Sequence, residues 1–168
     1  MLEQLRSKVQ SCKNCPLYRE IMVLPNIGVG SSHPDIMFIL GGVDRESLIF
    51  EKPFNQVSET VLVKCLQNAH IPMNKCYVTS IIKCGSLKDR KPNIETCSEW
   101  LIQEINELQP KVLFFIGKKT YEIFNKKYGD TGIKTLIEDS TLQGIFSRSS
   151  LMKGFVERLK LANGFCQR

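Results

Sequence analysis

The sequence predicts an α/β fold with three stacked layers, α/β/α, around a central and mainly parallel sheet. Two observations lead to this prediction. Short and almost continuously apolar runs are typical of strands that are covered on both faces. These runs alternate along the chain with stretches that have the length and spacing of helices. Such alternation produces right-handed strand–helix–strand crossovers, which place helices on both faces of one sheet.

The strands are expected at three apolar runs, which are IMFIL at 36–40, CYVTSII at 76–82 and VLFFI at 112–116. Each run has the length of an ordinary strand, and its apolar character is nearly unbroken rather than alternating. We therefore place all three in the interior of the sheet.

Helices are expected before, between and after these strands. The N-terminal stretch MLEQLRSKVQ has amphipathic spacing, and the second helix begins at Ser58 as a candidate N-cap. The remaining helices are expected from Asn93 to 108, from 118 to a stop at Gly129, and from Ser149 to Leu161. No internal repeat, low-complexity tract or linker interrupts this pattern, so we expect a single domain over residues 1–168.

Composition limits the possible environments and partners. The 168 residues are 42% hydrophobic and 24% charged, which is typical of soluble globular proteins. No stretch approaches the roughly 20 apolar residues of a membrane helix, and the N-terminus lacks the apolar centre of a signal peptide. We therefore expect no membrane contact and a cytoplasmic location in a bacterial or viral setting. The net charge of +6 and the pI near 9.0 favour a polyanionic partner.

The cysteines form a pattern that packing alone does not require. Cys12 and Cys15 form a C-x-x-C pair, Cys84 ends the second predicted strand, and Cys97 lies in the first turns of the next helix. A redox dithiol would be expected between a strand and a helix, whereas the first pair follows an N-terminal helix. Two such pairs can converge on zinc or on an iron–sulfur cluster, and the spacing does not choose between them. The other three have the character of small apolar residues: Cys65, Cys76 and Cys166.

Several segments between about residues 9 and 125 occur in the order seen in one known family. They are CKNCPL, DIMFIL, KPF at 52–54, CYVTSIIKC, DRKPNIETC and PKVLFFIGKKTYEIF. With these segments the chain resembles the family-four uracil-DNA glycosylases, a class built around a four-iron four-sulfur (4Fe–4S) cluster. The resemblance implies a uracil-DNA glycosylase-like fold and a structural cluster that holds the loop between its last two ligands. It implies four ligands: Cys12, Cys15, Cys84 and Cys97.

The resemblance also implies a base-binding pocket, which has changed in this chain. Phe54 matches the phenylalanine that stacks on uracil, although a core aromatic is the alternative. Ser80 stands where the family has an asparagine that reads the uracil edge. A hydroxyl cannot offer the paired donor and acceptor of an amide, and loss of such a pair costs several kcal/mol.

Two further motifs of the family are altered. The G-E-A-P-G motif aligns with LGGVD, so that Leu40 and Gly41 line the base site and Gly41 replaces the glutamate. Asp44 and Glu46 are the nearest carboxylates that could act in catalysis, or they are solvated loop charges. In the segment that resembles H-P-S, Ser147 and Arg148 replace the histidine and the proline.

Contacts to DNA are expected from a set of basic and polar residues, because neutralising phosphates requires clustered cations. The set is Lys88, Arg90, Lys91, Ser147 and Arg148, and scattered solvated side chains are the alternative. We favour a module on a glycosylase scaffold that has lost most or all uracil excision. Its binding partner would be DNA or a protein of a replication or repair complex. An active DNA glycosylase that acts on uracil or another base is the alternative. A cluster-containing nucleotide-binding protein is a third hypothesis.

Overall fold

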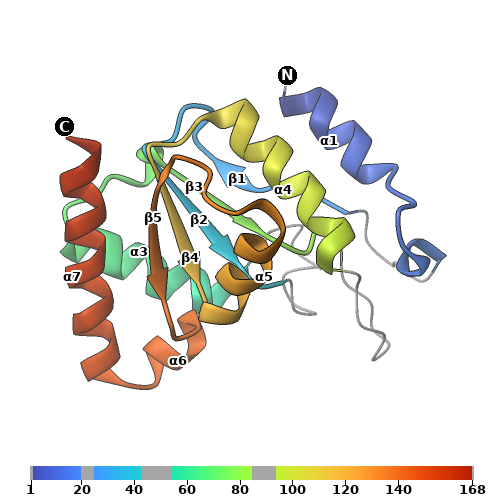
Figure 1. Cartoon of the computed structure of the whole chain (residues 1–168). Coiled ribbons are helices and arrows are strands. Elements are labelled where there is room, and N and C mark those ends of the chain that lie inside the picture. The colour runs from blue at the N-terminus through green and yellow to red at the C-terminus, as the bar shows by residue number, and fades with distance from the viewer. Residues whose placement is uncertain (1, 20–24, 43–53, 85–93, 168) are drawn as a thin grey trace.

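The computed structural model describes residues 2–19, 25–42, 54–84 and 94–167, and these form a three-layer α/β/α structure (Figure 1). The described strands make one sheet in the order β1-β3-β2-β4-β5. Their bounds are β1 (Val29–Gly30), β2 (Ile36–Leu40), β3 (Cys76–Ser80), β4 (Val112–Ile116) and β5 (Lys134–Glu138). Only β1 runs antiparallel, to β3. The predicted fold class is therefore confirmed.

The register of the parallel strands brings their carboxyl ends to one edge of the sheet. Leu40 at the end of β2 pairs with Ser80 on β3 and with Ile116 on β4, and Ile116 in turn pairs with Glu138 on β5. In open α/β sheets, ligands bind outside the carboxyl ends of the strands. This edge is consequently the place to look for a functional site.

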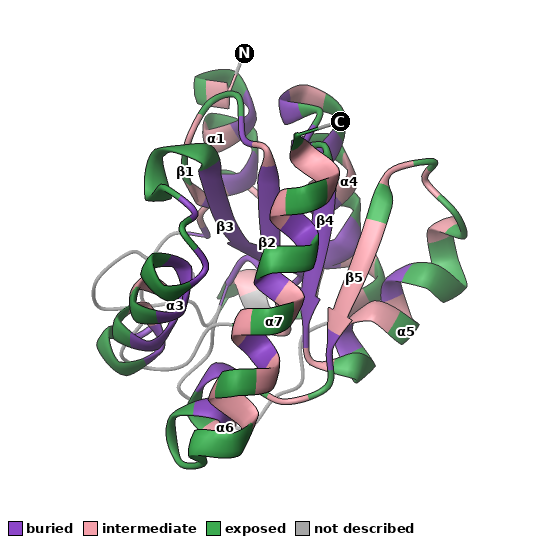
Figure 2. Cartoon of the chain, turned by 90° about the vertical axis from the view of Figure 1, so that its left-hand side faces the viewer, coloured by how far each residue is buried: buried purple, intermediate pink, exposed green. Residues whose placement is uncertain are grey.

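Helices cover both faces of the sheet. One face packs against α3 (Gln56–Asn68), α6 (Leu142–Phe146) and α7 (Ser149–Cys166), and the other against α4 (Ile94–Leu108) and α5 (Lys118–Tyr128). Alternate residues of β2 enter the two cores: Ile36 and Phe38 face α3 and α7, while Met37 and Ile39 face α4 and α5. Figure 2 shows strands β2, β3 and β4 buried behind α7, as the continuous apolar runs predicted.

Helix α1 (Leu2–Gln10) packs on α4 and contributes only Leu2 to the edge of the core beneath α4 and α5. Its inward side chains, Leu5 and Val9, form a small apolar cluster with Ile27, and the ring of Trp100 on α4 packs against this cluster. The N-terminal segment is thus attached to the rest of the molecule through α4 and through the segment before β1 that contains Ile27. No helix in the described part of the chain combines the length and the apolar character that crossing a bilayer requires.

Helix α7 is fixed to the sheet near its middle and at its C-terminal end. On α7, Arg158 donates to the buried Glu138 carboxylate at the end of β5, with an Nη2–Oε2 distance of 2.6 Å. At the C-terminal end of the helix, the Lys111 ammonium donates to the backbone oxygen of Cys166 at 2.9 Å. The helix runs five residues beyond its predicted end at Leu161, because its apolar face continues along the sheet.

The sequence placed the start of the second helix incorrectly. Helix α3 is capped by Asn55, whose side-chain Oδ1 accepts a hydrogen bond from the backbone N–H of Ser58 at 2.8 Å. Ser58 is therefore the third residue of the helix rather than its N-cap. An amide oxygen is as good a capping acceptor as a hydroxyl, and the three-residue offset is the usual capping geometry.

We expect the Asn55 cap to contribute measurably to stability. Replacement of Asn55 with Ala should lower the free energy of unfolding by about 1 kcal/mol, because the N–H groups at the start of α3 lose a partner. Replacement with Asp, which keeps the acceptor oxygen, should cost much less. Urea denaturation followed by circular dichroism measures both, and equal losses in the two variants would contradict the capping role.

Candidate metal centre

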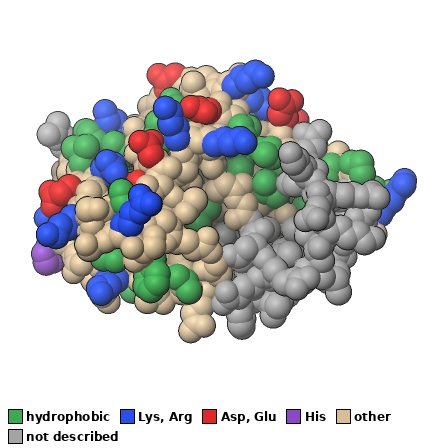
Figure 3. Space-filling model, turned by 90° about the horizontal axis from the view of Figure 1, so that it is seen from below, with side chains coloured by type: hydrophobic (Ala, Val, Ile, Leu, Met, Phe, Trp, Pro, Cys, Tyr) green, Lys and Arg blue, Asp and Glu red, His purple; other side chains and the backbone are tan. Residues whose placement is uncertain are grey.

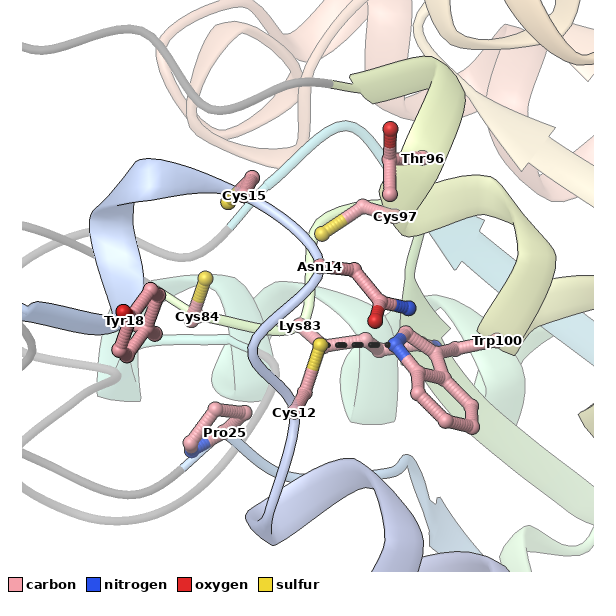
Figure 4. Close-up of a pocket in the computed structure, with 10 residues that line it drawn as sticks. All are labelled: Cys12, Asn14, Cys15, Tyr18, Pro25, Lys83, Cys84, Thr96, Cys97 and Trp100. Atoms are coloured by element: carbon pink, nitrogen blue, oxygen red, sulfur yellow. Dashed lines mark hydrogen bonds between the residues drawn. The ribbon is translucent and has the colours of Figure 1, made fainter.

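Four cysteines from separate segments line one pocket at the end of the molecule where α1 and α4 meet (Figure 4). Cys12 follows α1, Cys15 precedes a short 3₁₀ helix (Pro16–Arg19), Cys84 follows β3, and Cys97 lies in the first turn of α4. Cys84 and Cys97 are 7% and 5% exposed, whereas Cys12 and Cys15 are partly exposed. The topology thus gathers thiols that are far apart in the sequence.

The position of Cys84 differs from the prediction that it ends the second strand. Strand β3 ends at Ser80, because its partner β2 ends at Leu40 and provides no further backbone groups. The chain then continues in an irregular segment, where the backbone oxygen of Lys83 accepts from the N–H of Asn26 at 3.1 Å. This departure from the sheet turns Cys84 towards α4.

Cys84 and Cys97 influence each other's ionisation. The interaction of the Cys84 thiol with the Cys97 sulfur lowers the pKa of Cys97 to about 6 and raises the pKa of Cys84. Burial works against the ionised form of both. The backbone N–H of Lys83 and its positive charge also favour the Cys97 thiolate. One sulfur of the pair therefore ionises readily, which is the form that binds metals.

A tryptophan side chain contacts the other pair. The indole Nε1 of Trp100 donates to the sulfur of Cys12, with a distance of 3.3 Å (Figure 4). Trp100 lies three residues after Cys97 on α4, so the two side chains occupy the same face of the helix. The indole thereby links the first cysteine pair to the helix that carries the last cysteine.

A buried ion pair lies directly behind the pocket. The ammonium of Lys83 is 2.7 Å from Oε1 of Glu104 on α4, and the two side chains are 1% and 0% exposed. Lys83 also donates to the Thr79 hydroxyl at 2.7 Å. In the described part of the chain, neither carboxylate oxygen of Glu104 has a well-aligned hydrogen-bond donor, so charge attraction to Lys83 is what holds the group.

The donor set of the pocket fits an iron–sulfur cluster chemically. Four thiols are the usual ligands of a 4Fe–4S cluster, and a buried cation with a nearby indole N–H suits a negatively charged centre. Among the described residues, no three side chains of His, Cys, Asp or Glu are arranged to hold a metal ion. A cluster and a single zinc ion place the ligand sulfurs differently. In a 4Fe–4S cluster each thiolate binds a different iron, whereas one zinc ion binds all of its thiolate sulfurs at a Zn–S distance of about 2.3 Å.

The residues predicted to bind a base lie at the carboxyl edge of the sheet, apart from one. Leu40 and Ser80 are neighbours across β2 and β3, and Gly41 follows Leu40. The Ser80 hydroxyl is 2% exposed and donates to the backbone oxygen of Ile82 at 2.6 Å. Phe54 is buried in the apolar cluster with α3, α6 and α7, and its predicted stacking on a base stays a prediction.

Two of the residues predicted to contact DNA are exposed between α6 and α7. Ser147 ends α6 and donates to the backbone oxygen of Gly144 at 2.9 Å, and Arg148 precedes the first residue of α7. Seen from below, the described part of this side carries basic side chains interspersed with acidic ones rather than a continuous basic band (Figure 3). The other predicted residues lie outside the described residues: Asp44, Glu46, Lys88, Arg90 and Lys91.

Sequence reasoning did not identify Lys83, Glu104 or Trp100 as parts of the site. Signals for all three were present. Lys83 directly precedes Cys84, Glu104 interrupts the apolar stripe of its helix, and Trp100 is the only tryptophan of the chain. What the sequence does not provide is the pairing of Lys83 with Glu104, which depends on the packing of α4 against β3.

The fold and the cysteine-lined pocket together define an α/β protein with a candidate metal centre beside the carboxyl edge of its sheet. The family model of the uracil DNA glycosylase superfamily matches residues 27–159 of this sequence. The chain therefore belongs to the uracil DNA glycosylase superfamily. The matched range contains Cys84 and Cys97 but begins after Cys12 and Cys15.

Curated relatives support the same assignment. The chain is 24% identical to a type-4 uracil-DNA glycosylase of Archaeoglobus fulgidus over 129 residues, which are 74% of this chain and 64% of the relative. It is 25% identical to the type-4 uracil-DNA glycosylase of Saccharolobus solfataricus over 75% of this chain and 60% of the relative. For the Thermotoga maritima enzyme of the same name, the identity is 25%, over 80% and 72%. The chain thus spans less than two thirds of the length of the first two relatives.

A solved structure has the same fold. It is the solution NMR structure of a candidate uracil DNA glycosylase from Methanosarcina acetivorans, with a TM-score of 0.52 and 12% sequence identity. The match covers 81% of this chain and 95% of that one. At this identity, the likeness concerns the fold alone.

The buried ion pair gives a stability prediction. Replacement of Lys83 with Met should lower the free energy of unfolding by about 3–5 kcal/mol, because Glu104 is then left buried without a counter-charge. The double variant, Lys83→Met with Glu104→Leu, should recover much of this loss. Chemical denaturation of the two variants measures the difference, and a double variant no more stable than the single one would contradict the charge-pairing explanation.

Proposed function

We propose that this protein is a uracil-DNA glycosylase-like iron–sulfur protein that binds DNA as an accessory module of replication or repair, with lost or much reduced uracil excision. The observation that carries this proposal is the state of Ser80. It stands where the family resemblance implies the asparagine that reads the uracil edge, and its only hydroxyl proton is already donated within the chain. The position therefore offers no free donor to a base.

The neighbouring positions support the same conclusion. Gly41 stands in place of the family glutamate, and a Cβ atom at this position would lie 2.9 Å from the hydroxyl oxygen of Thr120. Because Thr120 is buried, a glutamate at position 41 would require this side chain to move. Ser147, in place of the histidine, also donates its hydroxyl proton within the chain. The positions that recognise uracil in the family and the positions that assist catalysis are thus altered together.

The proposed cofactor is held by four ligands, Cys12, Cys15, Cys84 and Cys97. When bound, the cluster supplies structural cross-linking and no chemistry on the base. Its role follows from the chain connectivity, since residues 85–93 lie between two of the ligands and contain Lys88, Arg90 and Lys91. Fixing both ends of this segment restricts the conformations that its basic side chains adopt. The centre is coupled in this way to the segment that carries three of the predicted DNA contacts.

Binding to DNA is supported by charge and by position. The chain carries a net charge of +6, and Arg148 is exposed at the start of α7. Phosphate contacts of this kind give affinity without base specificity, and they weaken as salt concentration rises. The proposed DNA contact therefore does not depend on an intact base pocket.

The alternative function is an active DNA glycosylase with altered specificity, in which Asp44 or Glu46 supplies the catalytic carboxylate. Membership of the superfamily and the names of the curated relatives favour this alternative. In that case the enzyme hydrolyses the N-glycosidic bond of uracil or another damaged base. The two functions differ in whether an abasic site is formed.

We expect the purified protein to retain DNA without producing abasic sites. Labelled single- and double-stranded oligonucleotides containing uracil are incubated with the protein, treated with alkali and separated by size, with an active uracil-DNA glycosylase as the positive control. Filter retention of the same oligonucleotides is measured at several salt concentrations. Release of uracil at rates near those of the control enzyme would overturn the proposal, and failure to retain DNA at low salt would overturn the DNA-binding part.

The same retention measurement tests Arg148. Replacement of Arg148 with Ala should weaken retention of all sequences to a similar extent and reduce the slope of log K against log salt by about 1. Replacement of Lys75 with Ala is the matched control, because Lys75 is an exposed cation at the opposite edge of the sheet, just before β3. An equal effect of both replacements would indicate attraction by overall charge rather than a contact at Arg148.

The cluster is tested by colour and metal content. Protein purified without oxygen should be brown, with broad absorbance near about 400 nm and roughly four iron atoms per chain, because four thiolates hold a 4Fe–4S cluster. Replacement of Cys84 or Cys97 with Ser should remove the iron and lower stability, since ligand binding and folding are coupled. Replacement of the buried Cys65, outside the pocket, should leave the iron in place. Wild-type protein without iron or sulfide would contradict the proposed cofactor.

A further inference from the structure

Trp100 occupies a position that packing alone does not explain. Its ring lies against the small apolar cluster of Leu5, Val9 and Ile27, which a phenylalanine would also fill. Its one polar atom, Nε1, donates to the sulfur of Cys12 at 3.3 Å (Figure 4). A phenylalanine cannot make this second contact.

We propose that Trp100 is a positioning residue of the cysteine centre, and that its indole N–H both orients the Cys12 sulfur and reduces the negative charge on it. The proposal rests on the cluster assigned under the proposed function and goes beyond it. The proposed function names the four cysteines that hold the cluster. This inference concerns a residue that is not a ligand and that sets the reduction potential of the cluster.

The direction of the effect follows from electrostatics. Reduction adds one electron and therefore one negative charge to a centre that already carries four thiolates. A hydrogen bond donated to a ligand sulfur stabilises the more negative, reduced form, and so raises the reduction potential. Removing the donor while keeping the ring should make the cluster harder to reduce.

The two cysteine pairs are supported differently. Cys97 receives the backbone N–H and the charge of Lys83, both from the segment that precedes Cys84. On the opposite side, the described contact of Cys12 with a donor is the indole of Trp100. Since Cys12 is connected to α1 and Trp100 belongs to α4, this hydrogen bond fixes the sulfur to a helix outside its own segment.

The test compares two variants with the wild-type protein. Trp100→Phe keeps an aromatic ring but lacks the donor. Because the chain has one tryptophan, that residue can also be replaced throughout by β-(3-benzothienyl)alanine, which has the shape of tryptophan and a sulfur atom in place of the N–H. The reduction potential is measured by dye-mediated titration under anaerobic conditions, together with iron content and visible absorbance.

Both variants should bind iron and be harder to reduce than the wild type. We expect roughly a tenfold smaller ratio of reduced to oxidised cluster at a fixed applied potential, which corresponds to a shift of about 59 mV for one electron. Tyr128→Phe is the matched control. This replacement removes the hydrogen bond between Tyr128 on α5 and Ser98 on α4, the helix that also carries Trp100. No sulfur takes part in that bond, so the reduction potential should stay unchanged.

The outcomes separate this inference from the proposed function. Iron-loaded variants with the wild-type potential would overturn the role of Trp100 and leave the cluster intact. A wild-type protein that binds no iron would overturn the cluster itself. A lower potential in both donor-free variants, with no change in the Tyr128 control, supports the inference, because a role in packing alone would not distinguish an isosteric ring from tryptophan.

Discussion

The arrangement of the centre depends on the buried ion pair between Lys83 and Glu104. Each charge is out of water and requires the other, so the segment after β3 is held against α4 at a fixed register. Cys84 is the residue after Lys83. Cys97 lies seven residues before Glu104, which is two helical turns along the same face of α4. The contact that pairs the two charges therefore also brings the two sulfurs together.

The candidate metal centre and the residues predicted to bind a base belong to different parts of the same scaffold. The cysteines are supplied by the N-terminal segment, the chain after β3 and the start of α4, whereas Leu40, Gly41 and Ser80 lie at the carboxyl ends of β2 and β3. Because these residue sets do not overlap, substitutions at the predicted base-binding positions need not disturb the thiols or the buried pair. One scaffold can in this way keep its architecture while the residues of one site change.

The parts of the fold that sequence reasoning predicted are those whose signals are local. Strands β2, β3 and β4 are covered on both faces and so appear as apolar runs. Strand β5 was missed because it is half exposed at the edge of the sheet and contains Lys134 and Glu138. The position of Phe54 depends on packing: it is buried in the apolar cluster with α3, α6 and α7, and its predicted stacking on a base stays a prediction. The Lys83–Glu104 contact joins two elements, and no local pattern predicts it.

Helix α7 extends over the depth of the sheet, with Arg148 at one end and Cys166 at the other. Its 18 residues correspond to a rod of about 27 Å, which is fastened through Arg158 to β5 and through Lys111 near its far end. The backbone at Arg148 is therefore adjacent to a rigid element rather than to a free loop. When a polyanion binds this guanidinium, little backbone entropy is lost, because the main chain is already ordered. The loss of conformational entropy is then confined to the Arg148 side chain.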